Sequence, residues 1–349
     1  MFLMNNWYVV AFSTDVGSQP LARHVCGLPI VLYRTASGKV AALEDRCIHR
    51  GVPLSFGGEC EGDIIRCPYH ALEFGPDGLC TKVPGQDNVP PNARIFSYTS
   101  VERDGLVWIW PGDPEKADES LLVSPSYHND EGWTWQPVFL EIEADWQMLN
   151  DNLLDLTHVG VVHKQTIGGN PSQHSGARVK TMKDGERGVK VIRHMPESDP
   201  PPLYQMATTF PGKIDRWQEI EFVPGVIKIW SGGTDAGTGA FDGNRTGGVQ
   251  LKGFHGVTPS SKGSLYYHFT QAFNFEADEA LREKLHEGAR FTLLEDKAVI
   301  EAQQARVDET PERPFADVTA DAAGLQARRI IRRLIEQESN VGGMSLHAN

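Results

Sequence analysis

Residues 47–70 of the chain read CIHRGVPLSFGGECEGDIIRCPYH. The stretch opens with the tripeptide CIH and closes with the tetrapeptide CPYH, and the glycines and prolines near both peptides are typical of loops. Two thiolates and two imidazoles form a complete set of metal ligands. The sequence therefore predicts a metal site built from two loops, with four candidate ligands: Cys47, His49, Cys67 and His70.

The identity of the metal depends on how the ligands are paired. A single zinc ion accepts a tetrahedral set of sulfur and nitrogen ligands, but zinc fingers usually group Cys with Cys and His with His. A [2Fe–2S] cluster with both cysteines on one iron and both histidines on the other fits the CxH…CxxH order better. The neutral imidazoles make the cluster less negative and raise its reduction potential, which suits it to accept electrons from a ferredoxin or a flavin. The other cysteines, Cys26, Cys60 and Cys80, lack a suitably spaced histidine and are interpreted as ordinary thiols.

Around this stretch the sequence divides into two unlike parts. Residues 27–34 and 39–45 are apolar runs joined by a Gly-containing loop and predict a β-hairpin, and residues 104–110 predict a further strand that ends at a proline. The acidic, proline-containing stretch 111–120 is the best linker candidate. We therefore expect an all-β domain over residues 1–112 and an α+β domain over residues 113–349, with an antiparallel sheet flanked by helices.

Composition excludes several classes of protein. The chain has 349 residues, and 33 Lys and Arg against 46 Asp and Glu give a net charge of -13. This charge would repel nucleic acid and anionic membranes, and no apolar run reaches the roughly 18 residues of a membrane span. Five cysteines, an odd number, argue against a disulfide framework, and no secretory signal is apparent, so we expect a cytoplasmic protein.

A second set of candidate ligands lies in NDNLLDLTHVGVVH, residues 150–163. Asn152, Asp155 and His158 are spaced at i, i+3 and i+6 and are expected to share one stripe of a helix. His163 is about 140° out of phase with His158, so the helix should end or bulge near Gly160 if both rings are to converge. Two imidazoles need one carboxylate to complete the facial triad of a non-haem Fe(II) oxygenase, which leaves sites open for O2.

The carboxylate is expected in the helical pattern RFTLLEDKAVIEAQQ, residues 290–304. Asp296 shares a face with apolar residues, and a buried acid requires a partner or a metal. Glu295 also neighbours apolar residues, so periodicity alone leaves both acids open.

The pairing of CxH/CxxH with a later DxxHxxxxH resembles the oxygenase component of the Rieske non-haem iron oxygenases. Segments along nearly the whole chain resemble the branch of vanillate O-demethylase, dicamba O-demethylase and toluenesulfonate methyl-monooxygenase: NNWYVVAF, CIHRGVPLS, CPYHALEF, NDNLLDLTHVGVVH and LLEDKAVIEA. The resemblance implies an N-terminal Rieske [2Fe–2S] domain, a C-terminal catalytic domain and a head-to-tail homotrimer. It also implies that His158, His163 and Asp296 hold the Fe(II), with Asn152 near the iron. Asp155 then bridges His70 of a neighbouring subunit to the iron ligands by hydrogen bonds.

Three further positions are singled out by the resemblance. Ala71 stands where relatives usually carry Gly, and a positive φ there would strain it. Lys228 and His255 are candidates for substrate binding, against the alternatives of a surface strand lysine and a buried structural histidine.

The predicted reaction is an NAD(P)H- and O2-dependent monooxygenation of a small aromatic substrate, most simply O- or N-dealkylation. The chain has no GxGxxG or flavin motif, so electrons must come from a separate ferredoxin or flavin reductase. Ring or methyl hydroxylation by the same centres is the alternative. A Rieske electron carrier without chemistry of its own, and a structural zinc protein, are remoter hypotheses.

Overall fold

A computed structural model describes residues 1–341 of the chain and divides it into two compact units. Unit 1 comprises Met1–Ser124, Thr258–Lys262 and the chain from Ile335 onward; unit 2 comprises Pro125–Val257 and Gly263–Leu334. No helix among the described residues is long and apolar enough to cross a membrane.

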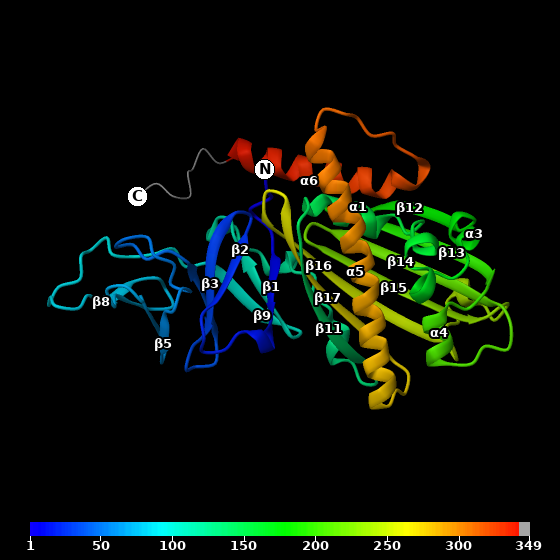
Figure 1. The fold of residues 1–349 in the computed structure, drawn as a ribbon, viewed down its shortest axis with the longest axis horizontal. Helices are drawn as coiled ribbons and strands as arrows, with labels where there is room; N and C mark the ends of the chain where they lie inside the picture. Colours follow the sequence, from blue (N-terminus) through cyan, green and yellow to red (C-terminus); the bar gives the residue numbers. More distant parts are fainter. Residues whose placement is uncertain (342–349) are drawn as a thin grey trace. The chain divides into compact units, whose positions relative to one another are not determined.

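Unit 1 is built from three small antiparallel sheets, with the strand orders β1-β10-β9, β2-β3-β4 and β5-β6-β7-β8 (Figure 1). The strands are β1 (Tyr8–Phe12), β2 (Leu21–Val25), β3 (Leu28–Arg34), β4 (Val40–Glu44), β5 (Glu59–Glu61), β6 (Ile64–Arg66), β7 (Glu73–Phe74), β8 (Cys80–Lys82), β9 (Thr99–Arg103) and β10 (Leu106–Trp110). Short 3-10 helices are η1 (Ser13–Asp15), η2 (Pro114–Lys116) and η3 (Glu119–Leu121). The expected hairpin is confirmed as β3 paired with β4, and β10 ends immediately before Pro111 as expected.

The strand β3 has a continuous apolar sequence because both of its faces are buried. Ile30 and Leu32 pack into the same core as Tyr8 of β1. Val31 and Tyr33 point the other way, into a second core that contains Cys47 and Cys67. The sheet β2-β3-β4 thus packs against the two cysteine loops on one face and against the core that contains β1 on the other.

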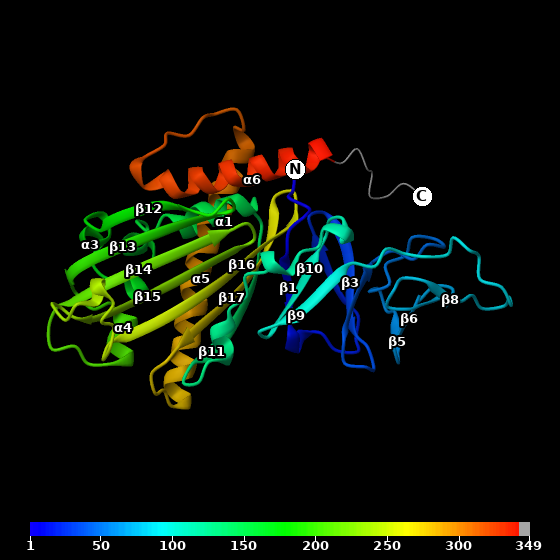
Figure 2. The same cartoon turned by 180° about the vertical axis from the view of Figure 1, so that it is seen from behind.

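Unit 2 is a seven-stranded antiparallel sheet in the order β11-β17-β16-β15-β14-β13-β12, with helices on one face (Figures 1 and 2). The strands are β11 (Thr134–Ile142), β12 (Arg178–Asp184), β13 (Gly188–Ser198), β14 (Ile214–Val223), β15 (Val226–Asp235), β16 (Val249–Ser261) and β17 (Ser264–Phe273). The helices are η4 (Ser126–Asn129), α1 (Trp146–Leu154), α2 (Val159–Val162), the π-helix η5 (Lys164–Gly168), α3 (Pro171–Ser175), α4 (Pro202–Ala207), η6 (Ala240–Asp242), α5 (Glu279–Glu309), η7 (Thr319–Asp321) and α6 (Ala322–Val341). The last residues of α6 and the end of β16 belong to unit 1.

The long helix α5 crosses one face of this sheet and contacts α1, α4 and β11 (Figure 1). Because side chains alternate along a strand, every second residue of β14 to β17 points toward the helices. This alternation places Arg216 and Gln218 of β14 on the helix side and Glu219 and Glu221 on the opposite side. The space between sheet and helices contains the second set of candidate ligands.

Candidate metal centres and substrate pocket

Helix α1 ends earlier than the helical spacing of residues 152–158 predicts. Asp145 is its N-cap, and the Asp145 carboxylate accepts a hydrogen bond from the backbone N–H of Gln147 at 2.9 Å. The helix stops at Leu154, with Asp155 as an extended C-cap. The expectation that Asn152, Asp155 and His158 share one helical stripe up to Gly160 is therefore wrong.

The helix ends at Asp155 because its side chain competes with the helix for hydrogen bonds. One carboxylate oxygen accepts from the backbone N–H of Thr157 at 2.9 Å, and the other accepts from the Thr157 hydroxyl at 2.9 Å. The Asp155 backbone carbonyl lies 2.7 Å from Nδ1 of His158 and fixes that ring. The resemblance implied a contact through the carboxylate, whereas the structure makes it through the backbone.

The chain brings His163 back toward His158 by a second irregularity. After the short helix α2, the backbone N–H of Gly168 donates to the His163 carbonyl at 2.8 Å, which closes the π-helical turn η5. Gly168 is required there, because a Cβ would lie 2.3 Å from the Val159 carbonyl oxygen. The helix was expected to end or bulge near Gly160, whereas α1 ends at Leu154 and the π-helical turn follows His163.

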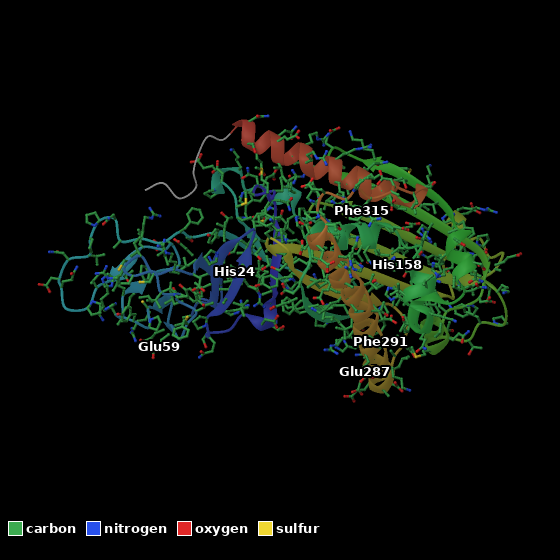
Figure 3. All side chains as sticks on the ribbon, turned by 45° about the horizontal axis from the view of Figure 1, so that its top comes forward. His24, Glu59, His158, Glu287, Phe291 and Phe315 are labelled. Carbon is green, nitrogen blue, oxygen red and sulfur yellow. The ribbon has the colours of Figure 1, made fainter. Side chains whose placement is uncertain are left out.

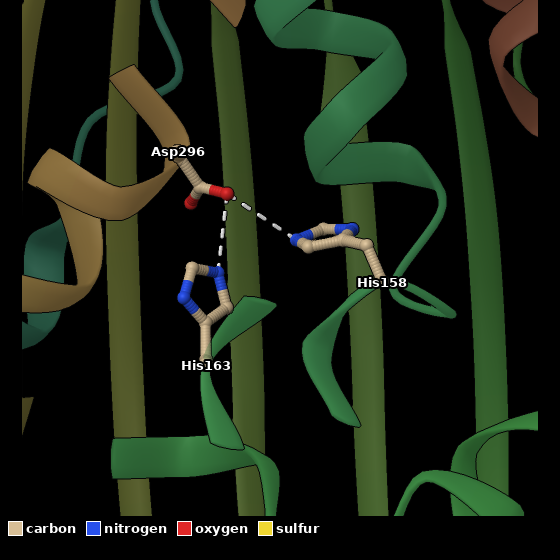
Figure 4. A group of neighbouring side chains, drawn as sticks. All are labelled: His158, His163 and Asp296. Atoms are coloured by element: carbon tan, nitrogen blue, oxygen red, sulfur yellow. Dashed lines mark ion pairs between the residues drawn. The ribbon is translucent and has the colours of Figure 1, made fainter. Parts of the chain in front are cut away.

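Helix α5 contributes two carboxylates, Asp296 and Glu295, which contact the histidines in different ways. Asp296 is 5% exposed, and its Oδ1 lies 3.4 Å from Nε2 of His158 and 3.1 Å from Nε2 of His163 (Figure 4). Asn152 donates to the same Oδ1 at 3.0 Å. Glu295 lies behind His163, with Oε2 2.8 Å from Nδ1. Of the two acids that periodicity left open, Asp296 faces both imidazoles and Glu295 orients one of them.

This arrangement fits a metal ion. One ligand atom from each of His158, His163 and Asp296 lies within 4.8 Å of the other two. Both Nδ1 atoms are occupied, by a backbone carbonyl and by Glu295, so the two Nε2 atoms are free to coordinate. Two nitrogens and one carboxylate oxygen on one side of an ion are the donor set of non-haem Fe(II) oxygenases.

The pKa values of Asp296 and His163 are shifted by their contacts within the triad. Burial alone would raise the pKa of Asp296, but hydrogen bonds and the charges of His158 and His163 outweigh burial and lower it. Burial would lower the pKa of His163, and Asp296 and Glu295 reverse this and raise it. Both shifts have one cause, which is the attraction between the Asp296 carboxylate and the imidazoles that face it.

Glu295 gives a testable prediction. We expect Glu295→Gln to weaken iron binding at the triad by about 10- to 100-fold, because the neutral amide orients and polarises His163 less well. Iron affinity is measured by chelator competition on cluster-loaded protein. Glu287→Gln, an exposed residue two turns earlier on α5, is the matched control and should bind iron as wild type does (Figure 3). Equal affinity in both variants would show that Glu295 does not support His163.

A pocket between the sheet and the helices contains the triad. It holds about 820 Å³ of empty space, part of it open to solvent, and its wall combines apolar residues with a few polar ones. The apolar residues are Leu153, Leu156, Val159, Ile167, Leu203, Ile229, Leu251, Phe269, Ala289 and Leu293. The polar ones besides the triad are Asn152, Tyr204, Arg216, Gln218, Ser231, His255, Gln271 and Thr292. A pocket of this kind accepts a small, largely apolar molecule.

The two candidate substrate contacts lie in different places. His255 lines the pocket, and its Nδ1 is 2.5 Å from the Tyr267 hydroxyl. Burial lowers the pKa of His255 to about 3, so its ring is neutral. Lys228 is on the opposite face of the sheet, in a separate hollow, and its ammonium lies 3.1 Å from Glu221. The structure therefore does not bring Lys228 to the pocket that contains the triad.

In unit 1 the two cysteine loops have the same backbone pattern. The Cys47 N–H donates to the Val52 carbonyl at 2.9 Å, and the Cys67 N–H donates to the Leu72 carbonyl at 2.8 Å. In each loop the N–H four residues after the cysteine donates back to the cysteine carbonyl. The donors of these return bonds are Gly51, with φ 72°, and Ala71, with φ 56°. Ala71 thus has the positive φ that was a concern, and it carries the backbone strain that glycine avoids.

These loops fit a [2Fe–2S] cluster. Cys47 and Cys67 are each 2% exposed, and the rings of His49 and His70 lie side by side at the surface with centroids 4.6 Å apart. Burial, together with the neighbouring Cys67, raises the pKa of the Cys47 thiol to about 11, so the thiol would lose its proton only to a metal. Each loop contributes one buried sulfur and one imidazole, so the two sulfurs can bind one iron of such a cluster and the two adjacent imidazoles the other.

Known proteins match both halves of the chain. The Rieske [2Fe-2S] domain matches residues 6–97, and the vanillate O-demethylase oxygenase C-terminal domain matches residues 142–337. The iron–sulfur subunit of a toluene-4-sulfonate monooxygenase system from Comamonas testosteroni is 37% identical over 97% of this chain and 99% of its own length. The vanillate O-demethylase oxygenase subunit of a Pseudomonas strain is 35% identical over 100% of this chain and 99% of its own. The crystal structure of dicamba monooxygenase bound to dicamba has a TM-score of 0.87 at 29% identity, and the match covers 97% of this chain and 99% of that one.

The chain therefore belongs to the Rieske non-haem iron oxygenases with a catalytic domain of the vanillate O-demethylase type. It is the oxygenase component of such a system, and its cofactors are a Rieske cluster and a mononuclear non-haem iron. The α+β fold class with an N-terminal Rieske domain is confirmed.

Proposed function

We propose that this oxygenase removes an alkyl group from the oxygen or nitrogen of a small aromatic acid. The observation that carries the proposal is the triad of His158, His163 and Asp296 at the wall of an apolar pocket. In this proposal the triad holds the mononuclear Fe(II), and Cys47, His49, Cys67 and His70 hold the cluster. An aromatic acid is favoured by the relatives, since two of them are named for toluene-4-sulfonate and for vanillate.

The reaction balances as a monooxygenation. His158, His163 and Asp296 would hold the iron, which would supply the chemistry of O2 activation, by which one oxygen atom enters a C–H bond of the alkyl group. The substrate, O2, NAD(P)H and a proton give a hydroxylated alkyl carbon, water and NAD(P)⁺. The hydroxylated carbon then leaves as an aldehyde, because a hemiacetal or hemiaminal breaks down spontaneously, and the aromatic alcohol or amine remains.

The chain's own residues bind and position the reactants. His158, His163 and Asp296 would hold the ion at the wall of the pocket, whose space would admit O2 and the substrate beside it. The apolar wall holds the aromatic ring and excludes water, and this strengthens the remaining polar contacts. His255 is neutral, and its contact with Tyr267 leaves Nε2 for a hydrogen bond to the substrate.

We further propose that electrons pass between copies of the chain in a homotrimer, from His70 of one subunit through Asp155 of the next. In unit 1, exposed apolar side chains lie close in sequence to the cluster histidines: Ile48, Phe56 and Tyr69. In unit 2, exposed apolar side chains lie close in sequence to the triad: Val161, Phe291 and Val299. Exposed apolar side chains near both centres support association there.

A separate reductase, with or without a ferredoxin, completes the proposed system. Several relatives are named as an oxygenase component or as one subunit of a system, and this supports a separate electron donor. The five free cysteines of the described chain support the cytoplasm as its compartment.

The proposal is tested by measuring aldehyde, O2 uptake and substrate loss together. Iron-loaded protein with a surrogate reductase is offered methoxy-, N-alkyl- and methyl-substituted aromatics, each with and without an acidic group. We expect aldehyde in proportion to the substrate consumed. Substrate-dependent O2 uptake that gives a hydroxylated product and no aldehyde would overturn dealkylation in favour of ring or methyl hydroxylation. No uptake with any aromatic would favour an electron carrier.

A further inference from the structure

Arg216 is a buried cation in the wall of the triad pocket. The residue is 2% exposed, and its guanidinium donates to the carbonyl of Ile167 at 2.7 Å and to that of Gly168 at 3.2 Å. Its Nε has no hydrogen-bond partner. Within residues 1–341, no carboxylate forms an ion pair with it. Nε2 of His174 lies 3.4 Å from the guanidinium, and the ring of Tyr204 lies 5.4 Å from its central carbon. These neutral partners compensate only part of the charge, so the guanidinium keeps unused donors and has no carboxylate partner.

A second buried arginine adds to the positive charge. Arg193 of β13 is the cross-strand partner of Gln218, is 2% exposed, and likewise has no ion pair in the part of the chain that the structure describes. Burial lowers the pKa of Arg193, Asp155 acts against this, and Arg216 lowers it further. Burial, followed by the charge of Arg216, lowers the pKa of His174 to about 4, so His174 stays neutral. Two buried guanidinium groups without a paired carboxylate, Arg216 in the pocket wall and Arg193 on the adjacent strand, therefore place positive charge in this part of unit 2.

Neighbouring polar groups extend the donor surface. The Gln218 carbonyl oxygen accepts from Nε of Arg193 at 3.2 Å, and because arginine only donates, this contact fixes the orientation of the amide. The Gln218 NH₂ group is then available to donate into the pocket, which Gln218 and Ser231 both line. An anion placed here would meet a planar cation flanked by neutral donors.

We propose that Arg216 binds the anionic group of the substrate, a carboxylate or a sulfonate, and so makes the pocket selective for aromatic acids. The inference rests on the proposed function and deepens it, because it names the group that reads the substrate. A guanidinium fork matches either anion, and the anion supplies the charge that the fold leaves unpaired. The same pocket contains the triad, so holding the acid at Arg216 leaves the rest of the molecule to reach the metal.

The test compares matched anions and neutral amides. Dissociation constants are measured on the holoprotein for methoxybenzoates against methoxybenzamides, and for methoxybenzenesulfonates against the corresponding sulfonamides. We expect wild type to bind the anions at least about 10-fold more tightly than the amides. Arg216→Gln should abolish this preference while the amides still bind, and Arg216→Lys should restore part of it. The carboxylate and sulfonate series show which anion the pocket prefers.

Two controls separate this role from a structural one. Lys228→Gln removes the cation on the opposite face of the sheet and should leave the preference unchanged. Iron content and the midpoint of thermal unfolding show whether the variants retain the η5 turn that Arg216 contacts. The proposal is overturned if wild type binds no anion more tightly than its amide, or if Arg216→Gln keeps the preference. Aldehyde formed from neutral substrates alone would overturn it while leaving dealkylation intact.

Discussion

Replacing Asp296 with Ala is expected to abolish turnover and to remove the mononuclear iron while leaving the Rieske cluster in place. Within residues 1–341, Asp296 is the one carboxylate that faces both His158 and His163, and without it two neutral imidazoles must hold a divalent ion in an apolar pocket. The ratio of iron to acid-labile sulfide should fall from about 1.5 to about 1, because only the cluster iron remains.

The control for this variant is Asp308→Ala, at an exposed position near the end of α5. It should keep the wild-type ratio and the wild-type rate. Iron and sulfide are measured chemically, and product formation is measured with the same reductase. An Asp296→Ala protein with full iron and full activity would show that the triad is not the metal centre.

Asp155→Asn is expected to keep both metals and to lower reductase-coupled turnover by about 100-fold. The His158 ring is held by the Asp155 backbone carbonyl, which asparagine retains. The asparagine side-chain oxygen can also accept from the Thr157 N–H, so the turn should persist. What the variant loses is the charge of the carboxylate and one acceptor oxygen, which the proposed link to His70 of the neighbouring subunit requires.

Asp145→Asn is the matched control for this second variant. Asparagine is as good an N-cap as aspartate, so the start of α1 should be unaffected and turnover should remain at the wild-type level. Rates are compared at equal iron content. Wild-type turnover in Asp155→Asn would contradict an electron path through this carboxylate.

The cluster loops could be predicted from the sequence because their information is local. Cys47 and His49 lie in one tight loop and Cys67 and His70 in another, and the glycine at position 51 marks the turn. The β3-β4 hairpin could also be predicted, since its two apolar runs and the loop between them are local signals.

The end of α1 could not be placed, because two local preferences compete there. Residues 146–163 have helical periodicity, but Asp155 bonds to Thr157 and stops the helix. The prediction that His158 and His163 converge is therefore confirmed, but the continuous helical stripe from which His158 was predicted does not form. The choice between Glu295 and Asp296 also depended on which way α5 faces, and only the packed structure fixes that rotation.

The pocket was the least predictable part. Lys228 and Arg216 are both cations on neighbouring strands of one sheet, and the sequence does not show which face of each strand the helices cover. The pairing of β14 with β15 aligns Glu221 with Lys228 and sends both away from the pocket, whereas Arg216 points into it. Neighbouring residues of a strand point to opposite faces of the sheet. Only the strand register therefore shows which of the two cations lines the pocket.

If the two metal centres of this protein act in one reaction, a single turnover must consume electrons from the cluster and form product together. Protein with both centres reduced is freed of reductant and mixed with substrate and O2, and product and cluster oxidation are followed together. We predict that wild type forms product as its cluster is oxidised, and that Asp296→Ala forms none and keeps its cluster reduced far longer. Cluster oxidation at equal rates in both proteins, without product in either, would contradict the account.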